Sequence, residues 1–133
     1  IIPRNLVDKE IAHRGLSELK IVDSMHQRKA LMSEVSDAFI AMPGGYGTFE
    51  ELFEIITWEQ LGIHTKPIGL LDVAGYFEPL LALIAHAVAE GFIPAQHSNI
   101  VIHESSPAVL LDRLAIHQPD ITKNLWSELP PDR

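Results

Sequence analysis

The chain has 133 residues and a formal net charge of −8, and hydrophobic residues make up 47% of it. This composition is typical of a globular protein with a real core, and it excludes an intrinsically disordered chain. The acidic balance argues against a nucleic-acid partner, because binding to a phosphate backbone depends on Lys and Arg. There is no cysteine, which excludes disulfides, thiolate metal sites and cysteine nucleophiles.

Metal and membrane binding find no support in the sequence. The seven histidines are scattered, and none forms an HExxH motif or a close pair one helical turn apart. No apolar run approaches the roughly 20 residues that a membrane span needs. We therefore expect a cytoplasmic protein that binds no metal and no membrane.

Strand and helix signals alternate along the chain. Asp23 or Ser24 can cap a first helix, Gly91 and Pro94 end a third one, and Pro107 fits the first turn of a fourth. The predicted strands are 19–22, 38–42, 67–71 and 100–102, and the predicted helices are 25–36, 48–61, 76–90 and 107–117.

This alternation predicts an α/β fold, a Rossmann-like open parallel sheet flanked by helices, in a single domain over residues 1–133. The run 38–42 is apolar without alternation, as in a strand buried in a parallel sheet. We expect the segment 119–133 to be a loosely packed tail that Trp126 anchors. The opening Ile1-Ile2-Pro3 resembles the end of a strand, so we also expect the fold to be shortened at its N-terminus.

Between a predicted strand and a predicted helix lies the glycine-rich stretch PGGYGTFEE, residues 43–51. Glycines let a backbone approach a ligand closely, and the free N–H groups and positive dipole end of a helix attract phosphate. The stretch matches neither the P-loop nor the GxGxxG dinucleotide motif. From the residues alone, it is either a phosphate or nucleotide site or a plain tight turn.

Glu51 has two interpretations. With Thr48 it fits a T-x-x-E capping box, in which its carboxylate only satisfies a backbone N–H. Helical spacing also puts it on the side of Ile55 and Trp58, which makes it a candidate catalytic carboxylate beside the loop. The residues Glu50, Glu54 and Thr57 lie towards another side of the same helix, where each is ordinarily a solvated surface residue.

Arg28 is a second unusual residue. It falls within a predicted apolar stripe of Met25, Met32 and Val35, and burying an arginine without a partner is costly. It must therefore snorkel to water or find a carboxylate or a phosphate. The helices that carry Arg28 and Glu51 flank the same predicted strand, which favours one shared cleft.

Two motifs at this spacing resemble the Lonely Guy (LOG) family. They are SMHQRKA at residues 24–30 and PGGYGTFEE, which carries every fixed position of the family pattern PGGxGTxxE. The segments IITWEQLGIH at 55–64 and KPIGL at 66–70 continue the resemblance, which covers about residues 1–103. The resemblance also indicates that a first βαβ unit with its own glycine-rich loop, usual in the family, is absent from this chain.

The resemblance implies an activity, a site and an assembly. The activity is hydrolysis of the N-glycosidic bond of an N6-modified AMP to free base and ribose 5-phosphate, without metal or organic cofactor. Arg28 and Glu51 would form the catalytic pair, and a homodimer is expected. The implied substrate-binding residues are Glu10, Lys29, Gly44, Gly45, Tyr46, Gly47, Thr48, Glu50 and Thr57.

Two other functions stay open. The fold can serve as a nucleotide or phosphate-ligand binding protein without turnover, as the similar molybdenum-cofactor carriers indicate, or as a remnant that dimerises and binds nothing. We reject lysine decarboxylation, a name often attached to this family. That chemistry normally uses pyridoxal phosphate on a Schiff-base lysine, whereas the neighbours of Lys29 suit phosphate contact better.

Overall fold

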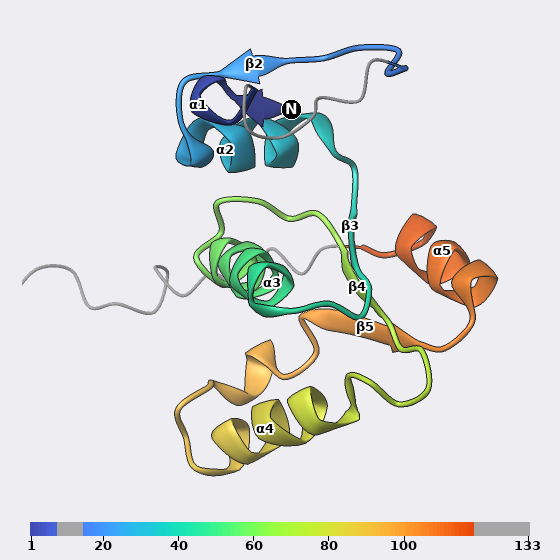
Figure 1. Ribbon diagram of the computed structural model, residues 1–133. Coiled ribbons are helices and arrows are strands. Elements are labelled where there is room, and N and C mark those ends of the chain that lie inside the picture. The colour runs from blue at the N-terminus through green and yellow to red at the C-terminus, as the bar shows by residue number, and fades with distance from the viewer. Residues whose placement is uncertain (8–14, 119–133) are drawn as a thin grey trace, which may run out of the picture. The chain divides into compact units, whose positions relative to one another are not determined.

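A computed structural model describes residues 1–7 and 15–118. It contains parallel sheets with helices packed on them, which confirms the predicted α/β class (Figure 1). The chain forms two compact units, Ile1–Ser36 and Asp37–Arg133, and each is described by itself. The predicted single domain over 1–133 stays a prediction, and the predicted tail with Trp126 lies outside the described residues.

The first unit is built on two short parallel strands. Its β1 (Ile2–Pro3) pairs with β2 (Ile21–Val22), and α1 (Arg4–Val7) follows β1 directly. Helix α2 (Met25–Val35) then begins behind Ser24, whose side chain accepts a hydrogen bond from the Gln27 N–H at 3.1 Å. Of the two capping residues expected from the sequence, Ser24 is the one used.

The predicted apolar stripe of α2 is wrong for the described chain. Met25, Met32 and Val35 are all exposed, with 43%, 38% and 54% of their surface accessible. The buried residue of this helix is Ser33, because α2 turns a different, more polar face towards β1 and β2.

The second unit holds a three-stranded parallel sheet in the order β3–β4–β5. Its elements are β3 (Phe39–Ala41), α3 (Tyr46–Gln60), β4 (Ile68–Leu71), α4 (Glu78–Ala89), the short 3₁₀ helix η1 (Ala95–His97), β5 (Val101–Glu104) and α5 (Pro107–Ala115). All four helices and four strands expected from the sequence therefore occur, with boundaries that shift by a few residues.

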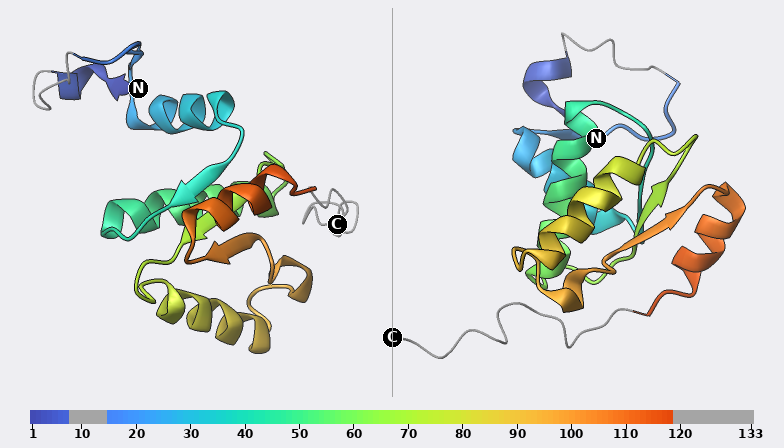
Figure 2. Two further views of the ribbon diagram at one scale, coloured as in Figure 1. Left: turned by 90° about the vertical axis from the view of Figure 1, so that its right-hand side faces the viewer. Right: turned by 90° about the horizontal axis from the view of Figure 1, so that it is seen from below.

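Helices cover both faces of this sheet (Figures 1 and 2). On one face, Leu52 of α3 and Phe77 before α4 pack with Ile68 and Leu70 of β4. On the other face, α5 packs its buried leucines against Ile102 of β5. Because α3 and α4 each follow a strand of one parallel sheet, both helices begin at the same edge, the carboxyl edge.

The expectation that the strand after Ala38 is buried is only partly correct. Every residue of the central strand β4 up to Leu70 is buried, whereas Ile40 in β3 is 43% exposed. The difference follows from position, because β4 has a strand on both sides and β3 is the terminal strand of this three-stranded sheet.

Candidate functional site

The glycine loop joins the carboxyl end of β3 to the start of α3. The strand ends at Ala41 and the helix begins at Tyr46, with Gly45 as its N-cap. Gly45 is extended, with φ −100° and ψ −154°, and no side chain caps this end of the helix. The first N–H groups of a helix have no intrahelical acceptor, so this end is open to an anion.

The three glycines of this loop differ in what a side chain at their position would meet. A Cβ on Gly44 would lie 2.2 Å from Thr48 Oγ1 and 2.9 Å from Thr48 Cβ, so only glycine fits there without moving the helix. A Cβ on Gly45 or Gly47 would meet nothing within 4 Å. Gly44 is therefore required by packing, while Gly45 and Gly47 leave open space beside the helix start.

The capping-box interpretation of Thr48 and Glu51 is wrong. The helix begins two residues before Thr48, and its first turn contains no acidic residue. Glu50 and Glu51 follow in the next turn. No acidic residue of the first turn therefore neutralises the positive end of the helix dipole, which favours binding of an external anion.

Glu51 lies on a partly covered side of α3. It is half-buried, as are Ile55 and Trp58, and Ile55 packs on the core next to β4. Glu50 is exposed, and so is Tyr46, which is 92% accessible at the helix start. The carboxylate one turn beyond the open helix end is thus partly shielded from water, in keeping with the second interpretation of Glu51.

Arg28 and Lys29 lie in α2 of the first unit, and both are half-buried. Among the described residues, the Arg28 Nε is buried and has no hydrogen-bond partner. A guanidinium N–H that is removed from water without an acceptor is suited to an anionic group. The pairing of Arg28 with Glu51 across the two units stays a prediction, and Glu10 lies outside the described residues.

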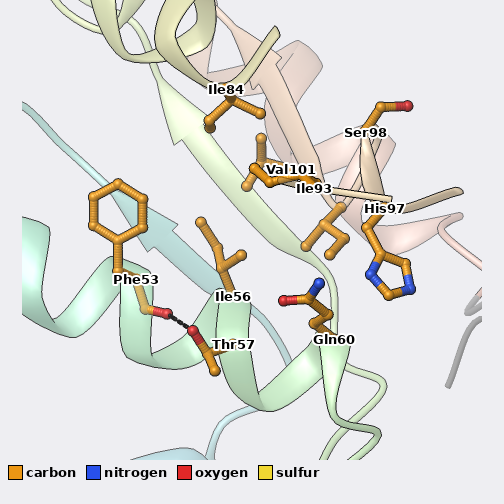
Figure 3. Close-up of a pocket in the computed structure, with 10 residues that line it drawn as sticks. Phe53, Ile56, Thr57, Gln60, Ile84, Ile93, His97, Ser98 and Val101 are labelled. Carbon is orange, nitrogen blue, oxygen red and sulfur yellow. Dashed lines mark hydrogen bonds between the residues drawn. The ribbon is translucent and has the colours of Figure 1, made fainter. Parts of the chain in front are cut away.

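Thr57 does not lie near the glycine loop within this chain. At roughly 1.5 Å per residue it is about 18 Å along the helix axis from Gly45. Its hydroxyl donates a hydrogen bond to the Phe53 carbonyl at 2.7 Å, and both residues line a pocket of about 200 Å³ (Figure 3). The other lining residues are Ile56, Gln60, Ile84, Ile93, His97, Ser98, Ile100 and Val101. The predicted role of Thr57 in substrate binding stays a prediction.

The second loop at the carboxyl edge carries polar residues that the sequence analysis did not single out. Asp72 follows β4 directly and is only 5% exposed. One carboxylate oxygen accepts a hydrogen bond from the Phe77 N–H at 2.8 Å, and the other lies 3.0 Å from His103 Nε2. The Phe77 N–H first, and His103 second, hold the pKa of Asp72 below its ordinary value.

A tyrosine connects the two loops. The Tyr76 hydroxyl donates a hydrogen bond to the Gly44 carbonyl.

Of these two features, only Asp72 could have been found from the sequence, since an aspartate follows the apolar run PIGLL at the carboxyl end of a predicted strand. The contact between Tyr76 and Gly44 spans 32 positions of the chain and required the structure.

The described ranges, 1–7 and 15–118, offer neither a metal cluster nor a membrane-spanning helix. No group of three or more His, Asp and Glu side chains in these ranges is placed to hold a metal ion. No helix there is long and apolar enough to cross a membrane.

The fold and this loop define the chain as an α/β protein with a glycine loop at the carboxyl edge of a parallel sheet, a place where such proteins commonly bind ligands. Residues 1–114 match the protein family described as "Possible lysine decarboxylase". The chain belongs to this family, the Lonely Guy family suggested by its motifs.

Curated relatives carry a different activity in their names. A probable cytokinin riboside 5′-monophosphate phosphoribohydrolase of Oryza sativa subsp. japonica is 50% identical over 130 residues, which are 95% of this chain and 53% of the relative. A cytokinin riboside 5′-monophosphate phosphoribohydrolase of Arabidopsis thaliana is 48% identical, with 95% of this chain and 61% of the relative covered. The chain thus spans little more than half the length of such relatives.

Proposed function

We propose that the protein hydrolyses the N-glycosidic bond of an N6-modified adenosine 5′-monophosphate and releases the free base and ribose 5-phosphate. The observation that carries this proposal is the open start of α3. Its N-cap Gly45 has no side chain to cap the helix, the first turn contains no acidic residue, and Glu51 lies one turn further on. The names of the relatives support the same substrate class, cytokinin riboside monophosphates.

In this proposal the loop holds the phosphate and the carboxylate serves the chemistry. The N–H groups from Gly45 onwards and the Thr48 hydroxyl bind the 5′-phosphate, with Tyr46 and Gly47 beside it. Water adds to C1′ of the ribose as the bond to the base breaks, and the base leaves with a proton. Glu51 orients that water and stabilises the positive charge that develops on the ribose.

The remaining residues keep the roles that the family resemblance implies. Arg28, whose Nε has no acceptor among the described residues, holds the substrate or keeps Glu51 ionised. Lys29, Glu10, Glu50 and Thr57 keep the substrate-binding roles that the family motif implies. Lysine decarboxylation does not fit these roles, because it normally uses a lysine that forms a Schiff base with pyridoxal phosphate, whereas Lys29 is assigned to substrate binding.

The test is a product assay. The protein is incubated with AMP and with N6-isopentenyl-AMP, and free base is measured by chromatography. Glu51→Gln should lower the rate of base release at least roughly 100-fold, the scale of a lost acid–base group. The matched control is Glu90→Gln, which removes an exposed carboxylate at the far end of α4.

Other outcomes distinguish the alternatives. A melting temperature that AMP raises, without base release, would replace the enzyme by a nucleotide-binding protein. No thermal shift and no product with either nucleotide would indicate that the loop binds no nucleotide.

We also propose that the protein is a cytoplasmic homodimer. The second unit leaves large apolar side chains exposed, among them Ile63 at 63%, Leu83 at 60% and Phe92 at 85%. Burying such side chains against a second copy removes apolar surface from water. Light scattering behind a sizing column tests the assembly, and a single monomer peak at micromolar concentration contradicts it. Cell fractionation tests the location.

A further inference from the structure

Tyr76 connects the two loops at the carboxyl edge of the sheet. It lies between β4 and α4, and its hydroxyl donates a hydrogen bond to the Gly44 carbonyl in the loop after β3. Both residues belong to the second unit, so the contact lies within one compact body.

The ring of Tyr76 is held on two sides. It stacks on Phe49 of α3, with ring centroids 6.4 Å apart and an interplanar angle of 7°. Its edge meets the ring of Phe77, with centroids 5.1 Å apart and an angle of 87°. Aromatic pairs at these distances and angles are attractive. The ring is 41% exposed, and these two contacts together with the hydrogen bond direct its hydroxyl towards the Gly44 carbonyl.

A fixed carbonyl also fixes the next amide. The peptide between Gly44 and Gly45 is planar and trans, so its C=O and N–H point in opposite directions. With the carbonyl turned to Tyr76, the Gly45 N–H points away from Tyr76. A peptide between two glycines is otherwise free to rotate, and the opposite orientation would present a carbonyl oxygen where the N–H now lies.

We propose that Tyr76 is a positioning residue for the phosphate site. By holding the Gly44 carbonyl, it keeps the Gly45 N–H directed outward as a donor to the phosphate of the ligand. This proposal rests on the function proposed above in placing the phosphate at the start of α3. It adds a residue from a different loop that acts through the backbone and does not touch the ligand.

The test compares Tyr76→Phe with the wild type. The variant keeps the ring and its stacking on Phe49 but removes the hydroxyl. Titrations with AMP should show about tenfold weaker binding, as expected for one lost hydrogen bond to a charged group. Titrations with adenosine, which lacks the phosphate, should be unchanged. In the assay for base release, KM for AMP should rise about tenfold with kcat nearly constant.

Phe49→Leu is the matched packing control, because it removes the stacked ring and keeps the hydroxyl. A purely structural role of Tyr76 predicts that both variants lose AMP affinity in proportion to their loss of melting temperature. That result would overturn the proposal. Loss of the AMP preference in Tyr76→Phe alone, at a nearly unchanged melting temperature, would support it.

The outcomes also separate this proposal from the proposed function. If the wild type binds AMP but releases no base, the hydrolase proposal fails and the affinity comparison still decides the role of Tyr76. If the wild type releases base and Tyr76→Phe has the same KM, Tyr76 is not a positioning residue and the hydrolase proposal stands. If the wild type prefers AMP no more than adenosine, both are wrong. Amide NMR of the free protein adds a ligand-independent readout, since the Gly45 signal should shift in Tyr76→Phe more than other loop signals.

Discussion

Two helices of the second unit begin at the same edge of one parallel sheet and are finished in opposite ways. At the start of α4, the Asp72 carboxylate accepts the N–H of Phe77, the residue just before the helix, at 2.8 Å, and Glu78 lies in the first turn, so two acidic side chains of the chain itself lie at that end. At the start of α3, the N-cap Gly45 makes no side-chain cap hydrogen bond and the first turn contains no acidic residue. Acidic side chains of the chain lie at the start of α4, whereas the first turn of α3 has none and suits an external anion.

Two similar strand–loop–helix units thus differ in the charge at their helix starts. Free N–H groups at a helix start need acceptors, and a side-chain oxygen of Ser, Thr, Asp or Asn is the usual one within a chain. The Asp72 carboxylate holds the loop after β4 through its contacts with the Phe77 N–H and His103. The loop after β3 has no such carboxylate, and a Cβ on its Gly45 or Gly47 would meet nothing within 4 Å, so the space beside the helix start is open.

The largest expected effect comes from placing an acidic side chain at the start of α3, as at the start of α4. Gly45→Asp places a capping carboxylate where a Cβ meets nothing within 4 Å. AMP affinity should fall at least about 100-fold, since the new carboxylate would repel the phosphate and compete for the same N–H groups. The melting temperature should stay the same or rise, because aspartate is a better N-cap than glycine. Calorimetric titration and thermal unfolding measure the two effects.

Gly45→Asn is the control for that variant. It has nearly the same shape and also caps helices, but carries no charge. It should keep more AMP affinity than Gly45→Asp. Equal affinity in wild type and Gly45→Asp would show that the phosphate does not bind at this helix end.

Much of this fold was readable from the sequence because its signals are local. The apolar run of β4, the proline at the start of α5 and Ser24 before α2 each fix an element through neighbouring residues. The exposure of Ile40 was not readable, because it depends on which strands flank β3.

The candidate site divides in the same way. The glycine loop was predicted from its residues, since glycine before a helix has a direct steric meaning. The exact start of α3 was not, because Thr48 and Glu51 fit a capping box equally well on paper while the helix begins at Tyr46. The hydrogen bond from Tyr76 to Gly44 joins segments that are distant in the sequence, so no local sequence pattern predicts it.

The second-largest expected effect is a loss of stability when the charge of Asp72 at the start of α4 is removed. Asp72→Asn removes the charge that faces the Phe77 N–H and His103. Hydrogen bonds to a charged acceptor are stronger than those to a neutral one, so the melting temperature should fall by several degrees. Thermal unfolding at pH 7 measures this. An unchanged melting temperature would mean that the carboxylate does not stabilise the start of α4.

The stabilisation that Asp72 provides should depend on pH. The pKa of Asp72 is lowered in the folded protein, so its stabilisation is complete above the ordinary carboxyl value of 3.8. It is lost as the pH falls from 3.8 through the lower folded value. The gap in melting temperature between wild type and Asp72→Asn should therefore narrow only below about pH 4.

The smallest expected effect lies at the opposite edge of the sheet, at His64 before β4. This buried ring has Nε2 at 2.9 Å from the Ile55 carbonyl, and its Nδ1 accepts the Lys66 N–H at 3.1 Å. A nitrogen that accepts an N–H carries no proton, so the ring is neutral. Burial is the main cause that lowers the pKa of His64 from its ordinary value of 6.5.

Folding therefore competes with protonation of His64 in acid. The unfolded chain binds the proton below pH 6.5 while the folded chain does not, so stability is lost as the pH falls from 6.5 towards the lower folded value. The melting temperature of the wild type should decline between pH 7 and 5 by a few degrees more than that of His64→Gln. Parallel declines would mean that His64 takes up its proton without cost to the fold. Since His64 is far from either helix start, AMP affinity at pH 8 should be equal in both proteins, which separates the stability of the sheet from the openness of its carboxyl edge.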